Sequence, residues 1–363
     1  MKPQMNELGF YTLAGAPESP RELIDEIRVG EDLGMGSVFI SERFNVKEAA
    51  TLSGAVGAVS TNLGIATAAT NQNTRHPMVT AAFAMTMHRL TGGRFSLGLG
   101  RGIKPIFDAF GLPAIKTAQM EDFADLMRRI WKGDVVFAHD GPAGQFPLLA
   151  MGPDYHDDIP LTMTAFADPS LRLGGRAFDA VVLHTFFSDE TTARCVRTIK
   201  DAAAEAGRDP ASVRVWSCFA TVGDHLPEEL RLKKTIGRLG TYLQGYGDLL
   251  VKTNRWDPAI LKRFRENEFV SGFAGALDAS ATTSDLERVA ELIPDEWLEA
   301  AATGSPDQCV EKIRGQFDLG CDGVILHGCS PAELVPVVEA YRASRPGDGR
   351  FDHLPANPAA SSK

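Results

Sequence analysis

The sequence predicts an α/β fold, a (β/α)8 barrel, and two observations carry that prediction. Short β-branched or apolar runs alternate with longer segments of helical periodicity, which is typical of βα units around a parallel sheet. Eight such runs, each followed by a helical segment, occur in 363 residues, and this favours a closed barrel over a doubly wound sheet. The first run also lacks the G-x-G-x-x-G turn that opens most doubly wound sheets.

The strand candidates are short, and all eight lie between residues 8 and 327. They are Leu8–Leu13, Ser37–Ser41, Leu63–Ala69, Phe95–Leu99, Leu161–Thr164, Ala180–Leu183, Val213–Ala220 and Gly323–His327. Helix starts are marked at Ser19, Ser305 and Ser330, where serine precedes proline and Glu or Gln stands three residues on. That spacing places a hydroxyl at the N-cap and proline at the first helical position.

Two connections exceed the usual loop length. Residues 133–160 are rich in Gly, Pro and Asp and predict a small hairpin with a loop. Residues 223–303 are largely helical and form an insertion between the seventh and eighth strands. An insertion there lies over the barrel mouth and forms either a lid or a helical buttress or dimer surface. We expect one domain over residues 1–345 and a flexible tail over 346–363.

Composition excludes several classes of protein. The formal net charge is −10, and no basic run or nucleic-acid motif occurs, which argues against DNA or RNA partners. No stretch approaches the roughly 18 apolar residues that a membrane span needs, and the start lacks a signal-peptide core. We therefore expect a cytoplasmic protein. Five scattered cysteines without CxxC, and histidines without HExxH, indicate neither a disulfide framework nor a metal site.

In a barrel enzyme, chemistry is carried at the C-terminal ends of the strands. The second strand is followed by Glu42 and Arg43, a charged pair that serves either a site or ion pairs at the rim. The third strand leads to Thr70 and Asn71, with Arg75 and His76 slightly later. The sixth and eighth strands end in His184 and His327, which serve as site residues or as buried core histidines.

A glycine cluster follows the fourth strand. Gly100, Arg101 and Gly102 precede Lys104, and glycines allow a backbone to approach a ligand closely. The guanidinium suits an anionic group, so we expect a cofactor contact here. Physical reasoning alone stops at a barrel enzyme with a metal-free site rich in Arg and Lys.

Several segments together resemble the bacterial-luciferase-like superfamily, and within it the oxidoreductases that depend on the deazaflavin coenzyme F420. The most specific are TRHP, GGRFSLGLGRG and GSPDQCVEKI, in that order and spacing. The resemblance covers most of residues 8–340 and leaves the insertion poorly matched. It implies a flavin or deazaflavin in the barrel mouth and, commonly, a homodimer formed through helices beside the second and third strands.

The resemblance also implies positions for the cofactor. A non-prolyl cis peptide is expected near Ala68–Ala69, beside Thr70 and Asn71, and the turn over residues 100–104 corresponds to the family's cofactor-contacting turn. The family's phosphate-binding turn corresponds to Ala165, Phe166 and Ala167. Asp168 stands there in place of the usual glycine, and a carboxylate beside a phosphate is unfavourable.

This chain differs from the family pattern at several residues, and these differences limit which reaction we expect it to catalyse. The F420-dependent sugar-phosphate dehydrogenases carry Asp-His after the second strand and a glutamate after the glycine-rich turn, where this chain has Glu42-Arg43 and Ile103. We therefore expect a reductase that passes hydride from F420 to a small organic substrate, with Glu42, Arg43, His184 and His327 as catalytic candidates. The alternatives are an FMN-dependent monooxygenase and a cofactor-binding paralogue without catalysis.

Overall fold

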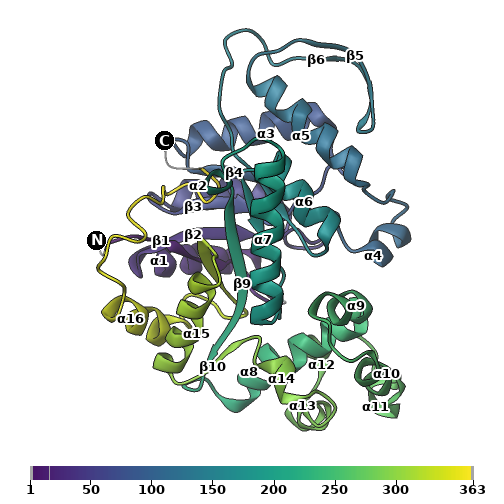
Figure 1. Ribbon diagram of the computed structural model, residues 1–363, viewed down its shortest axis with the longest axis vertical. Helices are drawn as coiled ribbons and strands as arrows, with labels where there is room; N and C mark the ends of the chain where they lie inside the picture. Colours follow the sequence, from purple (N-terminus) through teal and green to yellow (C-terminus); the bar gives the residue numbers. More distant parts are fainter. Residues whose placement is uncertain (1–2, 16, 361–363) are drawn as a thin grey trace.

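The computed structural model describes residues 3–15 and 17–360, and its centre is a closed barrel of eight parallel strands (Figure 1). The strands are β1 (Met5–Tyr11), β2 (Met35–Ile40), β3 (Gly64–Thr67), β4 (Phe95–Leu99), β7 (Leu161–Thr164), β8 (Ala180–Val182), β9 (Arg214–Gly223) and β11 (Gly323–His327). They neighbour one another in that order, and pairing of β11 with β1 closes the ring. The predicted barrel and all eight predicted strands are confirmed, and three of the strands have the predicted bounds.

Neighbouring strands pack closely where their residues are small. All residues of β2, β3 and β4 are buried, as expected for a barrel covered by helices outside and side chains inside. At Gly98 a Cβ would lie 1.6 Å from the carbonyl oxygen of Thr67, so β3 and β4 meet at this distance only with glycine there. The Thr67 hydroxyl also donates to the Gly98 carbonyl and fixes the register where the two strands approach the mouth.

Eight helices surround the barrel. They are α1 (Leu23–Asp32), α2 (Ala49–Val59), α3 (Pro77–Leu90), α5 (Thr117–Trp131), α6 (Asp168–Ala177), α7 (Asp189–Glu205), α15 (Pro306–Asp318) and α16 (Val335–Ala343). The capping boxes predicted at Ser19 and Ser305 both form. Ser330 and Glu333 exchange the same hydrogen bonds, but α16 begins only at Val335 because residues 331–334 form a turn.

Both long connections have the predicted secondary structure. Residues 133–160 contain the antiparallel hairpin β5 (Val136–Gly141) and β6 (Gly144–Leu149), which lies beyond α5 in Figure 1. The insertion is mainly helical and ends in β10 (Ala302–Gly304), which pairs with the end of β9. Its helices are α8 (Glu228–Leu232), a π-helical turn (Lys233–Gly237), α9 (Arg238–Asn254), α10 (Pro258–Glu266), α11 (Glu268–Gly272), α12 (Leu277–Ser280), α13 (Thr283–Ala290) and α14 (Asp295–Leu298).

The C-terminal segment differs from the expected flexible tail. Up to Ala360 it packs against the N-terminal end of the barrel, with Ala359 fully buried. The indole N–H of Trp216 donates to the Pro358 carbonyl at 2.8 Å, and the Asn357 amide donates to the Phe95 carbonyl at 2.9 Å. These bonds satisfy polar groups that the barrel floor would otherwise bury unpaired. Residues 361–363 lie outside the described part of the chain.

The two chain ends and the helices α4 (Lys104–Ala109) and α9 lie on opposite sides of the barrel (Figure 1). Both chain ends lie on the left of Figure 1, while α4 and α9 lie on the right, beyond the C-terminal ends of the strands. Within the described residues, no helix has both the length and the apolar character that crossing a membrane requires.

Candidate active site at the barrel mouth

The C-terminal ends of the eight strands bring most of the predicted site residues to one mouth. Glu42 follows β2, Thr70 and Asn71 follow β3, Gly100 follows β4, and His184 and His327 stand at the ends of β8 and β11. Because the strands are parallel, residues far apart in sequence share this end of the barrel.

Glu42 is held by several donors on the β2–β3 side of the mouth. Its carboxylate accepts hydrogen bonds from the Thr70 hydroxyl at 2.7 Å, from the Asn71 amide at 3.1 Å and from Arg75 at 2.6 Å. The backbone N–H of Ala49 donates to the same group at 3.3 Å. Because its oxygens are occupied by these donors, the carboxylate is suited to hold the end of β3 in place.

Arg75 joins a second carboxylate to this network. Its guanidinium also bonds to Glu48 and, at 2.8 Å, to the Thr70 hydroxyl. Burial acts to raise the pKa of Glu48, but hydrogen bonds from Thr51 and Arg75 outweigh it and lower that pKa to about 2. Arg75, which the sequence analysis noted only as lying near the mouth, is thus the centre of an ionic network.

Residues 68–71, which follow β3, form a ledge beside Glu42. The peptide between Ala68 and Ala69 is cis, at the position that the resemblance implies. At Gly100, a Cβ would lie 2.7 Å from the Thr164 hydroxyl and 3.0 Å from the Cβ of Ala69. Because Gly100 has no side chain, the backbone after β4 lies close to the backbone at the end of β3, where both reach the mouth.

The cationic residues predicted beside Gly100 have other partners. The guanidinium of Arg101 donates to the Ile115 carbonyl at 3.0 Å and to the Thr117 hydroxyl at 2.7 Å, so it joins this loop to the start of α5. Lys104 is exposed and pairs with Asp108 one helical turn later. Gly102 has a φ of +70°, which explains the glycine by backbone conformation.

The proposed phosphate turn lies at the start of α6. The Ala165 N–H donates to the Val182 carbonyl at 3.0 Å, and Ala167 is the N-cap residue without a side-chain cap. Phe166 instead packs on the His184 ring, with 4.4 Å between ring centroids. Asp168 is exposed at the first turn of α6, where its charge opposes an approaching phosphate.

His184 lies on the opposite side of the mouth from Glu42, within a cluster of aromatic rings. Tyr242 and Tyr246 of α9 and Phe187 lie against it, with ring centroids 5.0 to 6.0 Å apart. Its Nδ1 lies 2.8 Å from the Thr185 carbonyl oxygen and its Nε2 lies 3.0 Å from the Tyr246 hydroxyl. Burial lowers the pKa of His184 to about 4, so its imidazole is neutral at neutral pH.

His327 is a second neutral imidazole at the mouth. Burial, together with the positive charges of Arg238 and Arg43, holds the pKa of His327 well below its ordinary value. Its ring meets the Tyr11 ring edge-on at 5.5 Å. Its buried Nδ1 has no hydrogen-bond partner among the described residues. A buried polar atom of this kind is suited to a ligand.

Arg43 and Lys47 follow β2 but differ in environment. Arg43 is exposed, and its guanidinium forms no hydrogen bond or ion pair with any other residue that the structure describes. Lys47 is buried and donates to the carbonyls of Leu13 and Gly15, which fixes the loop after β1. Burial lowers the pKa of Lys47 to about 8.

Sequence reasoning missed four residues that contribute to the mouth: Lys47, Arg238, Tyr242 and Tyr246. The last three come from α9, in the segment that the family resemblance matches poorly. Arg238 is paired with Asp278 at 2.7 Å, and its guanidinium lies 5.9 Å from the Tyr242 ring centroid. The i, i+4 spacing of Tyr242 and Tyr246 is the one available signal, since it places both side chains on one helix face.

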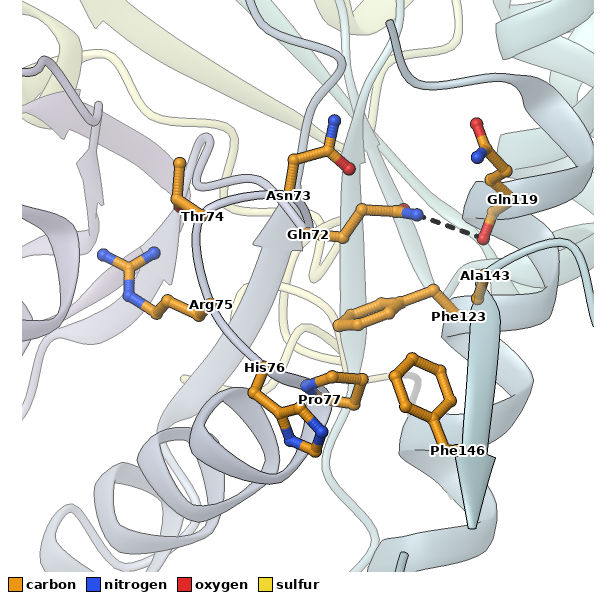
Figure 2. Close-up of a pocket in the computed structure, with 10 residues that line it drawn as sticks. All are labelled: Gln72, Asn73, Thr74, Arg75, His76, Pro77, Gln119, Phe123, Ala143 and Phe146. Carbon is orange, nitrogen blue, oxygen red and sulfur yellow. Dashed lines mark hydrogen bonds between the residues drawn. The ribbon is translucent and has the colours of Figure 1, made fainter. Parts of the chain in front are cut away.

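A separate cavity of about 420 Å³ lies behind the loop that follows β3 (Figure 2). Its lining comes from this loop, from α5 and from the β5–β6 hairpin: Gln72, Asn73, Thr74, Arg75, His76, Pro77, Gln119, Phe123, Ala143 and Phe146. In Figure 2 Gln72 reaches across the cavity to the Gln119 carbonyl, at 3.3 Å. His76 is the N-cap of α3 and accepts from Met78, which accounts for one of its nitrogens. The titratable groups Glu42, His184 and His327 lie at the mouth and do not line this cavity.

Comparison with known proteins agrees with this architecture. The chain is 27% identical over 305 residues to a 5,10-methylenetetrahydromethanopterin reductase of Methanolobus tindarius, covering 82% of this chain and 87% of the relative. It is 26% identical over 341 residues to an F420-dependent glucose-6-phosphate dehydrogenase of Nocardia farcinica, covering 88% and 91%. The solved coenzyme F420-dependent tetrahydromethanopterin reductase of Methanopyrus kandleri superposes with a TM-score of 0.76 at 20% identity, covering 92% and 97%.

The family model for luciferase-like monooxygenases matches residues 6–323, which span the barrel from β1 to the start of β11. With its closed barrel and polar mouth, the chain belongs to the luciferase-like monooxygenase family.

Proposed function

We propose that the protein is an F420-dependent oxidoreductase that reduces a small organic electrophile at the barrel mouth. The observation that carries this proposal is the mouth itself, where the end of β3, Gly100 with no side chain and the unpartnered Nδ1 of His327 all lie at the C-terminal ends of the strands. A relative that is named as F420-dependent supports the cofactor, and a relative that is named as a reductase supports the direction of the reaction.

The residues at the mouth fit a deazaflavin. Ala68, Ala69, Thr70, Asn71 and Gly100 would hold its ring, because they are small residues at the ends of β3 and β4 and place no bulky side chain at the mouth. Bound F420 would supply hydride chemistry at its C5 position. Arg101 and Lys104 already have partners within the chain, so we do not assign them to the cofactor.

The charged and neutral residues around this region divide the remaining tasks. Arg43 offers free guanidinium donors and would polarise the electrophilic group of the substrate. Glu42 would act by holding Thr70 and Asn71 in place, since its own oxygens are occupied. His327 is neutral and would donate to or accept from a ligand through Nδ1.

We further propose that the protein works in the cytoplasm as a homodimer. The small residues of α2 (AATLSGAVGAV) lie next to α3, where the large apolar side chains of Val79 and Leu90 are more than half exposed. A second copy would bury these side chains. Light scattering with size-exclusion chromatography checks this, and a monomeric mass at micromolar concentration would contradict it.

The family match favours one alternative, an FMN-dependent monooxygenase, because the family model is named for monooxygenases. The experiment that separates the two combines a fluorescence titration with an oxygen electrode. We expect the protein to bind F420, and reduced F420 to be oxidised anaerobically by carbonyl or imine acceptors. Binding of FMN but not F420, with oxygen uptake on reduced FMN, would overturn the proposal. Tight F420 binding without turnover across the panel would instead indicate a non-catalytic paralogue.

A further inference from the structure

The inference concerns Tyr246, which lies at a kink inside α9. Its φ of −151° and ψ of 34° are not helical, although residues on both sides of it are. Gly245 and Gly247 flank it, and glycine tolerates a local break in a helix. The kink accompanies an inward position of the side chain, because the Tyr246 hydroxyl lies 3.0 Å from Nε2 of His184.

The direction of this hydrogen bond follows from the other nitrogen of the ring. Nδ1 of His184 lies 2.8 Å from the Thr185 carbonyl oxygen, which can only accept, so Nδ1 carries the proton. In a neutral imidazole Nε2 is then an acceptor, and the Tyr246 hydroxyl must donate to it. The hydroxyl proton therefore points toward His184, and the oxygen lone pairs of Tyr246 remain for another donor.

His184 itself has no nitrogen left for a ligand. Both ring nitrogens are occupied, and Phe166, Phe187 and Tyr242 pack on the ring. Any effect of His184 on the reaction must therefore pass through the group it holds, which is Tyr246. This changes the catalytic role that the sequence favoured for His184 into a role of orientation.

Tyr246 lies against His184 on the β8–α9 side of the mouth. Strands β2 and β8 stand opposite each other in the ring of eight, and His184 follows β8 while Arg43 follows β2. Burial raises the pKa of the Tyr246 hydroxyl, and the positive charges of Arg43, after β2, and of Arg238, on α9 itself, act in the other direction. A ligand between these walls meets guanidinium donors on the β2 side and a hydroxyl acceptor on the α9 side.

We propose that Tyr246 contacts the substrate by accepting a hydrogen bond from it, and that His184 is a positioning residue that acts through Tyr246. Resting on the proposed function, this specifies the substrate class: a carbonyl or imine compound that bears a hydroxyl or N–H group beside the carbon that is reduced. Arg43 meets the electrophilic group, and Tyr246 meets the neighbouring donor.

The first test needs neither cofactor nor substrate. Long-range ¹H–¹⁵N spectra report the tautomer of each histidine, and the difference between wild type and His184→Gln assigns His184. We expect a proton on Nδ1 and none on Nε2 at pH 7, with the Nε2 resonance shifted in Tyr246→Phe. An Nε2-protonated His184 would overturn this inference and leave the F420 proposal standing. Failure to bind F420, with the tautomer of His184 as expected, would instead overturn the proposed function.

The second test uses hydroxyacetone and methoxyacetone as matched oxidants of reduced F420. We expect wild type to prefer hydroxyacetone by about tenfold in kcat/KM, the value of one ordinary hydrogen bond. Tyr246→Phe should lose the preference, and His184→Gln should add nothing further in the Tyr246→Phe background. Tyr155→Phe, on an exposed loop away from the mouth, is the control and should behave as wild type. Equal use of both compounds by wild type, or additive effects of the two substitutions, would overturn the proposal.

Discussion

The two walls of the barrel mouth satisfy their buried polar groups in different ways. On the β2–β3 side, Glu42, Arg75 and Glu48 form an ionic network that holds the end of β3. On the β8–α9 side, His184 and Tyr246 are uncharged and are enclosed by aromatic rings. The stability of the first side, the ionic wall, depends on complete pairing, because a buried charge without its partner is costly. The stability of the second side, the neutral wall, depends on its residues remaining uncharged.

The largest effect is expected from breaking the ionic wall. Arg75→Met should lower the free energy of unfolding by about 4 kcal/mol, because it leaves the buried Glu42 carboxylate without its counter-ion. Urea denaturation measures the loss. Arg172→Met removes an exposed pair with Glu205 and should change stability by less than about 1 kcal/mol. Similar losses in the two variants would show that the Glu42 network is no more than a surface ion pair.

Lowering the pH should reduce the free energy of unfolding by protonating the histidines of the neutral wall. The pKa of His184 falls from 6.5 to about 4 on folding, so the unfolded chain takes up a proton first as the pH drops. The stability from this group is full above pH 6.5 and is lost as the pH falls to about 4, amounting to about 3 kcal/mol. His327 contributes in the same direction. His184→Gln should therefore flatten, but not abolish, the loss of unfolding free energy between pH 7 and 4.5.

At lower pH, the free energy of unfolding should depend on the ionic wall, through Glu48. The pKa of Glu48 is lowered to about 2, so its contribution is present above its unfolded pKa near 4.5 and is lost below that. Glu48→Gln should change the slope of stability between pH 4.5 and 2.5 and leave the slope above pH 5 unaltered. A Glu48→Gln effect centred near pH 6 would contradict the assignment of separate pH windows to the two walls.

The ledge between the walls is sensitive to added volume. Gly100→Ala should cost about 1–2 kcal/mol of stability and weaken F420 binding, because its Cβ would lie within 3.0 Å of Thr164 and Ala69. Gly54→Ala in α2, where a Cβ meets nothing within 4 Å, should be neutral or stabilising. Thermal melts and fluorescence titrations compare the pair. Unaltered cofactor affinity in Gly100→Ala would place the ring elsewhere.

The smallest effect is expected at Lys104. It is exposed and pairs only with Asp108 among the described residues, so Lys104→Ala should leave F420 affinity within about twofold of wild type. A tenfold loss in the titration would return Lys104 to the cofactor site.

The barrel was predictable from sequence because its strands are buried on both faces and appear as short apolar runs between capped helices. The C-terminal segment was not, because its Gly- and Pro-rich composition does not reveal that Arg214 and Trp216 need its carbonyl groups. Its packed structure is a tertiary effect.

The mouth residues at the ends of strands were predictable from sequence, because the order of the strands determines where they lie. The mouth residues on loops and on helices outside the barrel were not. Strand ends placed Glu42, His184 and His327 correctly at one end of the barrel. Lys47 was missed because a lysine in a polar loop normally indicates solvent, and only the Leu13 and Gly15 carbonyls explain its burial. Tyr246 was missed because its position accompanies a single non-helical residue within α9.

The most direct test of the account is a crystal structure of the protein with F420 and hydroxyacetone. The account predicts the deazaflavin at the ledge of Ala68–Asn71 and Gly100, and the hydroxyl of hydroxyacetone within hydrogen-bonding distance of Tyr246. Cofactor bound instead in the cavity behind residues 72–77, or a ligand that contacts His184 directly while Tyr246 stays remote, would contradict it.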